Sequence, residues 1–146
     1  MKLELKHLAP YLPYRVKLNL TRRLFERTNV DIRNCDFRHN YTTNELYLWH
    51  NEVTYGWHEI KPILRPLSDL TKEIEHNGEK FIPIEWFEDK YYTLSLHKEC
   101  ERLLEEDGFN WVNHMSHLLF IHLTEWHFDI FGLIPEGLAI DLNTVK

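Results

Sequence analysis

Alternation of polar and apolar residues in the N-terminal half of the chain predicts β-strands. Tyr14–Leu20 (YRVKLNL) alternates in this way, as a half-buried strand does. Glu45–Trp49 (ELYLW) and Val53–Ile60 (VTYGWHEI) predict two more strands, which His50-Asn51-Glu52 would join as a hairpin. The segment 21–38 between these strands fits either a short helix or a further strand.

Prolines and turn residues divide the middle of the chain into short segments. Two prolines disfavour helical geometry in the residues before them, so 61–67 is expected to be extended or a turn. A short helix is predicted over Ser68–His76, because Ser68 is a good N-cap. Asn77-Gly78 is a strong turn signal. The residues 81–87 that follow predict a short extended segment.

Helical spacing of apolar residues is the main pattern in the C-terminal half. It predicts a helix over Tyr91–Glu106 and a second helix over Asn113–Phe128. The second helix is apolar nearly all round and is therefore expected to be the central buried helix. Leu138–Leu142 predicts a closing strand. The order of strands first and helices later predicts an α+β fold, in which N-terminal antiparallel strands pack with two to three C-terminal helices in a single domain, 1–146.

Composition indicates a globular protein of the cytoplasm. The chain has 146 residues and is 43% hydrophobic, which is enough to bury one core. No apolar run reaches the roughly 18 residues that a membrane helix needs, and the N-terminus has no signal-peptide pattern. Cys35 and Cys100 are the two cysteines, and no CxxC motif occurs. We therefore expect two reduced thiols and a cytoplasmic location.

The formal net charge of −6 is unevenly distributed along the chain. Residues 1–65 hold 11 basic and 7 acidic side chains, a net charge of +4, whereas residues 66–146 hold 6 basic and 16 acidic side chains, a net charge of −10. This polarity favours a surface with two signs of charge. Alternatively, the two halves interleave and their charges pair.

The basic stretch near the N-terminus is the candidate site for binding a partner protein or nucleic acid. It consists of Arg15, Lys17, Arg22, Arg23, Arg27, Arg33 and Arg38. Arginine forms bidentate contacts with phosphate and carboxylate groups. Aromatic residues that could stack on the bases of a single strand are interleaved with it: Tyr11, Tyr14, Phe25, Phe37 and Tyr41. The alternatives are a solvated face that pairs with the acidic half, and a protein-binding patch.

Histidines cluster in the C-terminal half at His114, His117, His122 and His127. Their spacings of three, five and five residues do not match the i, i+4 pattern of helical zinc sites. His114 and His117 share a helix face and would need a third ligand from elsewhere. We interpret the group as polar contacts at the edge of an apolar helix, and we expect neither a metal nor another cofactor.

Arg33 and His39 have the spacing of the R-x(4–6)-H signature of metal-independent HEPN-type ribonucleases. In those enzymes the motif opens a helix, whereas here it lies in a turn-rich, β-leaning stretch. The chain also contains no nucleophile elbow, P-loop or dinucleotide fingerprint. We therefore expect no enzymatic activity.

Three further segments carry a resemblance to a known family. They are Met1–Tyr14 (MKLELKHLAPYLPY), Ile60–Phe87 (IKPILRPLSDLTKEIEHNGEKFIPIEWF) and Leu118–Val145 (LLFIHLTEWHFDIFGLIPEGLAIDLNTV), about half of the chain. In these segments the chain resembles a small protein carried by phages and prophages of Bacteroidota. The basic stretch and the Tyr91–Glu106 helix lie outside the resemblance.

The resemblance implies a phage accessory protein in the cytoplasm of an infected bacterium. The function we expect in that setting is non-enzymatic inhibition of a host defence protein. A specific form of this function would be an anti-CRISPR that inhibits an RNA-guided nuclease, for example one of the RNA-targeting type VI kind. The acidic residues would then occupy a basic guide channel while the arginines contact the guide RNA or an acidic protein patch. The alternative is a nucleic-acid-binding accessory protein of phage replication or recombination.

Overall fold

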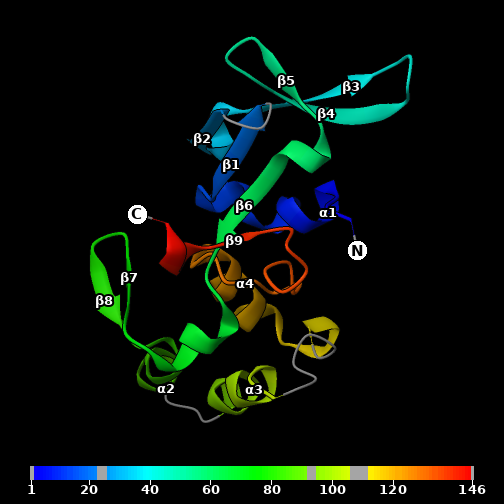
Figure 1. The fold of residues 1–146 in the computed structure, drawn as a ribbon. Helices are drawn as coiled ribbons and strands as arrows, with labels where there is room; N and C mark the ends of the chain where they lie inside the picture. Colours follow the sequence, from blue (N-terminus) through cyan, green and yellow to red (C-terminus); the bar gives the residue numbers. More distant parts are fainter. Residues whose placement is uncertain (1, 23–25, 92–94, 106–111, 146) are drawn as a thin grey trace. The chain divides into compact units, whose positions relative to one another are not determined.

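The computed structural model describes residues 2–22, 26–91, 95–105 and 112–145 (Figure 1). Contacts within the chain divide it into two compact units. The first unit comprises residues 1–64 and 133–146, and the second unit comprises residues 65–132. Strands precede the main helices, and most strand pairs are antiparallel, so the predicted α+β class is confirmed.

The first unit contains a four-stranded sheet in the order β2-β1-β6-β9 (Figure 1). Its strands are β1 (Lys17–Arg22), β2 (Glu26–Asp31), β6 (Ile60–Leu64) and β9 (Ile140–Asp141). β1 runs antiparallel to β2 and β6, and β6 runs parallel to β9. The ambiguous segment 21–38 therefore contributes strands, and the predicted closing strand exists as the short β9.

Alternation along β1 separates a buried face from an exposed one. Leu18 and Leu20 are fully buried and lie opposite Pro62 and Ile60 of β6. The strand begins three residues later than predicted, because Arg15 adopts a left-handed backbone conformation (φ 59°) after a short 3-10 helix. On the other face of β1, Lys17 is exposed and Asn19 and Thr21 are half-buried.

A second sheet of the first unit has three antiparallel strands in the order β3-β4-β5. They are β3 (Asp36–Asn40), β4 (Glu45–His50) and β5 (Val53–Tyr55). The predicted β4–β5 hairpin is confirmed, and both of its turn residues, Asn51 and Glu52, have positive φ, as a type I′ turn requires. The second strand of this hairpin is shorter than predicted.

Short helical segments complete the first unit. They are α1 (Leu5–Leu8) and the 3-10 helices η1 (Ala9–Tyr14), η2 (Ile32–Asn34), η3 (Trp57–Glu59) and η6 (Leu142–Thr144). η3 lies between β5 and β6 and replaces the end of the strand predicted over 53–60. β6 in turn includes residues 61–64 of the segment 61–67, which was expected to be extended or a turn, so the extended geometry is confirmed for these residues.

The second unit combines one β-hairpin with three α-helices. Its elements are η4 (Leu67–Thr71), β7 (Ile74–His76), β8 (Glu79–Phe81), α2 (Pro83–Tyr91), α3 (Ser95–Leu103) and α4 (His117–Glu125). Its core includes the buried side chains of Leu70, Phe87, Leu96, Cys100, Leu103, Leu119, Leu123, Phe128 and Ile130. Unlike the first unit, it is continuous in sequence.

The structure differs from two predictions for residues 68–87. Of the helix predicted over Ser68–His76, only residues 68–71 are helical, in the 3-10 helix η4; Ile74–His76 form β7 instead, because Asn77 and Gly78 form a tight turn with positive φ that pairs β7 with β8. The turn itself was predicted correctly. The segment 81–87 is not extended, because α2 begins at Pro83; proline is well tolerated in the first helical turn, where its missing N–H leaves no hydrogen bond unmade.

The two predicted long helices are present in part. α3 covers residues 95–103 of the helix predicted over Tyr91–Glu106, Tyr91 belongs to α2, and residues 92–94 and Glu106 lie outside the described residues. α4 is shorter than the helix predicted over Asn113–Phe128. α4 is capped at Ser116, whose Oγ accepts a hydrogen bond from the Leu119 amide at 3.3 Å. α4 is also not buried all round, because Leu118 is 37% exposed.

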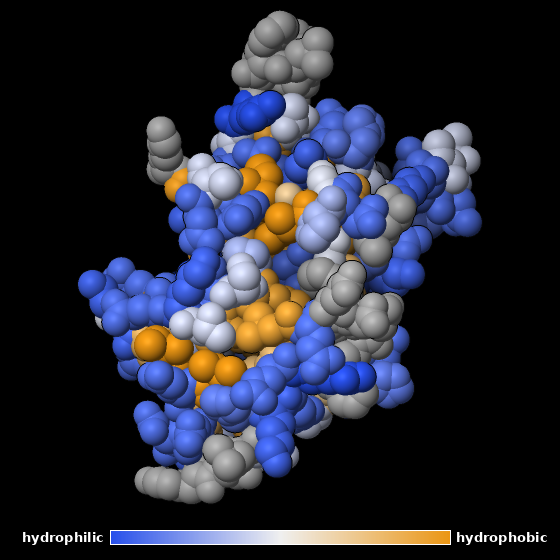
Figure 2. Space-filling view, turned by 60° about the horizontal axis from the view of Figure 1, so that its bottom comes forward, coloured by the Kyte–Doolittle hydropathy of each residue, from blue (hydrophilic) through white to orange (hydrophobic). Residues whose placement is uncertain are grey.

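The face of the molecule drawn in Figure 2 is mainly hydrophilic. In Figure 2, hydrophilic residues (blue) cover most of the visible surface, and hydrophobic residues (orange) reach it in patches between them. None of the helices in the described residues is long and apolar enough to cross a membrane. Tyr41 is the most exposed large hydrophobic side chain among these residues, at 90%, but a single exposed ring marks no site by itself.

A buried arginine, Arg65, joins three parts of the second unit. Its Nε donates to the carbonyl of Trp126 (3.0 Å) after α4, and its Nη2 donates to the carbonyl of Glu75 (2.7 Å) in β7. Its backbone amide donates to His127 O (2.7 Å), and its carbonyl accepts from Asp129 N (2.8 Å). Arg65 therefore fixes the end of α4 against the start of the unit and the β7–β8 hairpin.

We expect Arg65→Met to lower the free energy of unfolding by about 3 kcal/mol, because two carbonyl groups lose their hydrogen-bond donors. Urea denaturation followed by circular dichroism measures this change. The control is Arg102→Met, which removes an exposed ion pair with Glu105 (2.8 Å) and should cost less than about 1 kcal/mol. Equal effects of the two substitutions would contradict the role assigned to Arg65.

Candidate functional site

The β1–β2 hairpin places two of the predicted basic residues on one exposed sheet face. Residues that lie directly opposite each other in an antiparallel pair project to the same side. Lys17 lies opposite Asp31, and Thr21 lies opposite Arg27, so all four share the face away from Leu18 and Leu20. The Lys17 and Arg27 side chains are exposed.

A third cation on this face was missed by the sequence analysis. Lys61 of β6 lies opposite Asn19 of β1 and is exposed. Its local sequence contains no basic cluster, and only the pairing of β1 with β6 brings it beside the hairpin. We call this surface the cationic face, defined by Lys17, Asn19, Thr21, Arg27, Asn29, Asp31 and Lys61.

Neutral polar side chains occupy the centre of the cationic face. The Asn19 amide donates to Asn29 Oδ1 at 2.7 Å across the two strands. The Thr21 hydroxyl donates to Asn19 Oδ1 at 3.4 Å. These contacts hold the middle of the face with groups that are themselves hydrogen-bond donors and acceptors, while the three cations lie around them.

Two more predicted basic residues lie at one end of the hairpin. Arg15 lies two residues before the start of β1 and Arg33 lies in η2, and the backbone hydrogen bond from Ile32 N to Val16 O (2.9 Å) brings these two segments together. Both arginine side chains are exposed. The cationic face thus has additional positive charge at this end.

Most of these cations have no acidic partner in the described residues. Arg15, Lys17, Arg27 and Lys61 form no ion pair with any acidic side chain that the structure describes, whereas Arg33 contacts Asp31 at 3.6 Å. Pairing of the basic stretch with acidic residues therefore does not account for these four within the described ranges. Their charges are available to an external anion.

Arg38 is separated from this group. It lies on β3, its Nη2 contacts Asp36 Oδ2 at 3.4 Å, and its guanidinium lies 4.0 Å from the centre of the Trp49 ring. This geometry is a cation–π contact within the β3-β4-β5 sheet. The backbone of Arg22 ends β1, and Arg23 lies outside the described residues, so the structure does not place these two side chains.

Three of the aromatic side chains expected beside the basic residues lie elsewhere, and Tyr14 is half-buried at the end of η1, next to Arg15. Tyr11 is fully buried, Phe37 stacks on Trp57 with centroids 6.2 Å apart, and Tyr41 lies in the turn after β3. Phe25 is outside the described residues. The described cationic face therefore offers charge and hydrogen bonding rather than base stacking.

A cavity of about 800 Å³ lies beside the β3–β4 turn and η3 in the first unit. Its lining includes His39, Tyr41, Tyr47, Tyr55, Trp57 and His58.

The two residues of the ribonuclease signature, Arg33 and His39, have separate partners. His39 Nε2 hydrogen-bonds with Asn44 Oδ1 at 3.0 Å, and Arg33 pairs with Asp31. Arg33 and His39 are thus on different elements, η2 and β3, and do not form the helix-borne pair of the ribonuclease signature.

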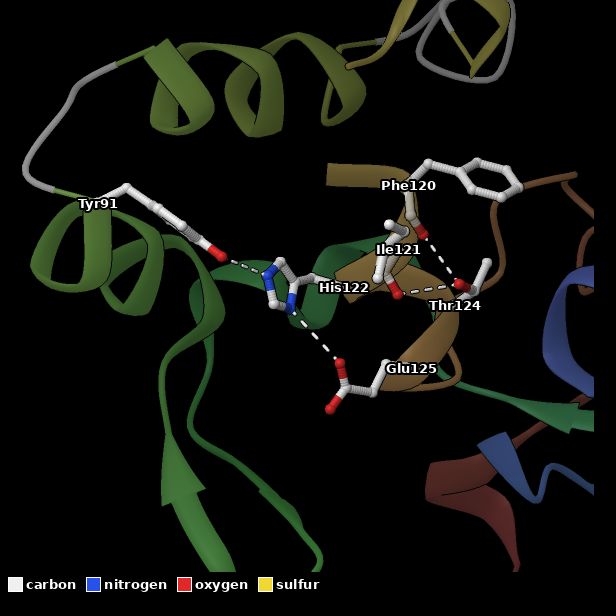
Figure 3. Close-up of polar contacts among 6 residues, drawn as sticks. All are labelled: Tyr91, Phe120, Ile121, His122, Thr124 and Glu125. Atoms are coloured by element: carbon white, nitrogen blue, oxygen red, sulfur yellow. Dashed lines mark hydrogen bonds and ion pairs between the residues drawn. The ribbon is translucent and has the colours of Figure 1, made fainter. Parts of the chain in front are cut away.

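His122 connects two helices of the second unit (Figure 3). Its Nε2 lies 2.7 Å from the Tyr91 hydroxyl at the end of α2, and its Nδ1 lies 3.5 Å from Glu125 Oε2, one turn further along α4. A carboxylate beside Nδ1 favours the ring proton on that nitrogen, so the phenol donates to Nε2. The phenol, imidazole and carboxylate therefore form one polar chain.

The other histidines of the cluster do not join this chain of contacts. His114 and His117 are exposed before and at the start of α4, and the His127 ring packs edge-on against His76 at 5.2 Å. No group of three or more histidine, cysteine, aspartate or glutamate side chains in the described residues could hold a metal ion. The structure therefore supplies no third ligand for His114 and His117 within these ranges.

Burial shifts the titration of several groups. It lowers the pKa of His122 from its ordinary value of 6.5, although Glu125 partly opposes this shift. Burial also lowers the pKa of His76. The Cys35 and Cys100 thiols are unpaired, and burial raises their pKa values to about 11 and about 12, so neither is an activated nucleophile.

We expect the free energy of unfolding to fall as the pH is lowered below about 6.5. A histidine with a lowered pKa binds its proton more weakly in the folded protein than in the unfolded chain, so protonation favours unfolding. His122→Gln removes one such group and should make stability depend less on pH in this range. Chemical denaturation at a series of pH values tests this, and an unchanged dependence would contradict the burial of a neutral His122.

Comparison with known proteins provides no match for this chain. No family model matches it, and neither a curated protein nor a solved structure matches it. The resemblance to a phage and prophage protein of Bacteroidota therefore stays a prediction. Functional inference depends on the chemistry of the described surfaces.

Proposed function

We propose that the protein is a non-enzymatic accessory protein that binds nucleic acid through its cationic face. The observation that carries this proposal is a set of four cations that have no acidic partner among the side chains that the structure describes. Three of them lie next to or on the β1–β2 hairpin and the fourth lies on the neighbouring strand β6: Arg15, Lys17, Arg27 and Lys61. A nucleic-acid backbone carries phosphate groups at regular intervals, and a surface with several separate cations can bind several of them at once.

The arrangement of the cations suits a flexible phosphate backbone. Lys17 and the position opposite Arg27 are four residues apart on β1, roughly 13 Å at the usual rise per residue, and Lys61 lies opposite the midpoint. The Asn19–Asn29 pair between them adds groups that hydrogen-bond to phosphate and sugar oxygens. Such contacts carry little sequence information, so the proposed binding is not sequence-specific.

The proposed binding should weaken steeply as salt concentration rises, because bound phosphates release counterions. The probe is a short fluorescein-labelled oligothymidylate, and fluorescence anisotropy across a salt series measures its affinity. The variant Lys17→Gln, Arg27→Gln, Lys61→Gln should lower the affinity about tenfold or more and reduce the log–log salt slope by about 2, at roughly 0.7 per lost phosphate contact.

A matched control removes the same charge from the second unit. Lys80, Lys90 and Lys98 are exposed there, and their triple change to glutamine should leave the affinity within about twofold of the parent. The proposal is wrong if the parent protein does not bind the oligonucleotide at low salt. It is also wrong if the two triple variants lose affinity equally.

The charge of the second unit favours a second candidate function, inhibition of a host defence protein such as an RNA-guided nuclease. Residues 65–132 hold 6 basic and 14 acidic side chains, a net charge of −8, whereas the first unit holds 11 basic and 9 acidic, a net charge of +2. Exposed carboxylates in this unit are Glu73, Glu75, Glu79, Glu85, Glu88, Asp89, Glu101 and Glu105. An acidic surface of this kind is complementary to a basic guide channel.

For this second candidate, the tagged protein should retain a defence nuclease from a host lysate both with and without nuclease treatment. Changing Glu85, Glu88 and Asp89 on α2 to their amides should reduce the retained amount, since it removes three negative charges from one helix. Mass spectrometry identifies the retained proteins. Retention that disappears on nuclease treatment would contradict direct inhibition and favour the accessory role.

A further inference from the structure

A small cavity in the second unit has no part in the proposed nucleic-acid contact. Its volume is about 220 Å³, and it lies among the β7–β8 hairpin, α2 and α4. The hairpin contributes Glu79 and Phe81, α2 contributes Trp86, and α4 with the residue after it contributes Glu125 and Trp126. His76, Asn77 and His122 complete the lining.

Three aromatic rings that contact one another in different orientations line this cavity. The Trp86 and Trp126 rings are nearly perpendicular (87°) with centroids 4.9 Å apart. The Phe81 ring is tilted by 56° to that of Trp126 at 4.9 Å and by 47° to that of Trp86 at 6.3 Å. Trp126 is buried, whereas Trp86 and Phe81 are half-buried and present ring surface to the cavity.

Two carboxylates give the cavity its charge. Glu79 forms no ion pair with any described residue, and Glu125 faces the Nδ1 of His122 at 3.5 Å, which orients its carboxylate. Burial lowers the pKa values of His76 and His122, so both are neutral at pH 7 and the lining has a net charge of −2.

Two cations outside the lining also lower the pKa values of these histidines: Arg65 lowers that of His76, and Lys90 lowers that of His122. The donors of Arg65 are directed to the Trp126 and Glu75 carbonyls, and Lys90 is exposed and therefore screened by solvent. Neither forms an ion pair with Glu79 or Glu125. The two carboxylates of the lining are thus left without a cationic partner in the described residues.

We infer that this cavity binds the guanidinium group of an arginine side chain from a partner protein. A guanidinium is planar and weakly hydrated, stacks on indole rings, and donates paired hydrogen bonds to a carboxylate. Trp86 and Phe81 supply the rings, and Glu79 of β8 and Glu125 of α4 supply acceptors. The two carboxylates would repel an anion. An uncharged ligand would not neutralise them, whereas a guanidinium supplies the positive charge that they lack.

The probe is N-acetyl-arginine amide, and its neutral isostere N-acetyl-citrulline amide is the comparison. Binding is followed by the indole N–H resonances of the full-length protein in two-dimensional NMR, because Trp86 and Trp126 line the cavity. We expect the arginine compound to bind at least about tenfold more tightly than the citrulline compound. N-acetyl-lysine amide should bind more weakly than the arginine compound, because its ammonium is not planar.

Two variants test whether the carboxylates are responsible. Glu79→Gln changes an exposed hairpin residue, and Glu125→Gln changes the acceptor beside His122; each should reduce the preference for arginine over citrulline several-fold. The matched control is Glu85→Gln with Glu88→Gln, two exposed carboxylates of α2 outside the lining, which should retain it. Equal binding of arginine and citrulline, or full preference in both single variants, would overturn the inference.

Discussion

The buried guanidinium of Arg65 is the interaction on which the second unit depends. Burial of this charge is costly, and Asp69 only partly offsets the resulting reduction in the pKa of Arg65. The cost is compensated because the guanidinium binds the carbonyls of Glu75 and Trp126, one in β7 and one after α4. These two anchors hold the hairpin and the end of α4 together, and the small aromatic cavity lies between the same elements.

In the first unit, strand pairing determines which side chains form the cationic face. The basic stretch is mixed with acidic residues in sequence, but the two-residue period of β1 and β2 places Lys17 and Arg27 on one side and the buried leucines on the other. Pairing of β1 with β6 then adds Lys61. The cationic face is therefore a product of register, and a shift of one residue in either pairing would disperse it.

Local patterns predicted the features whose cause is local. The alternation of Leu18 and Leu20 was sufficient to place β1, and Asn77-Gly78 was sufficient to place a turn, although not the hairpin that this turn closes. The predictions failed where a neighbouring element decides the outcome. Ile74–His76 is a strand because β8 pairs with it, and Lys61 joins the cationic face through a strand more than thirty residues away in sequence. His122 was considered with the other histidines as a candidate metal ligand. Its hydrogen bond with Tyr91 could not be predicted from the sequence, because α2 and α4 come together only in the folded unit.

The first unit is formed by two segments of the chain, 1–64 and 133–146, and this division affects the order of folding during synthesis on the ribosome. β9 follows the entire second unit in the chain, yet it pairs with β6, which precedes that unit. The second unit is continuous, and its two ends are joined by the backbone contacts of Arg65 with His127 and Asp129. We therefore expect it to fold first during synthesis, which shortens the effective loop that β9 must close. Until β9 emerges, the nascent β1–β2–β6 sheet has an unpaired edge at Ile63 and Leu64, and chaperone binding at that stage would protect this edge from association with other chains.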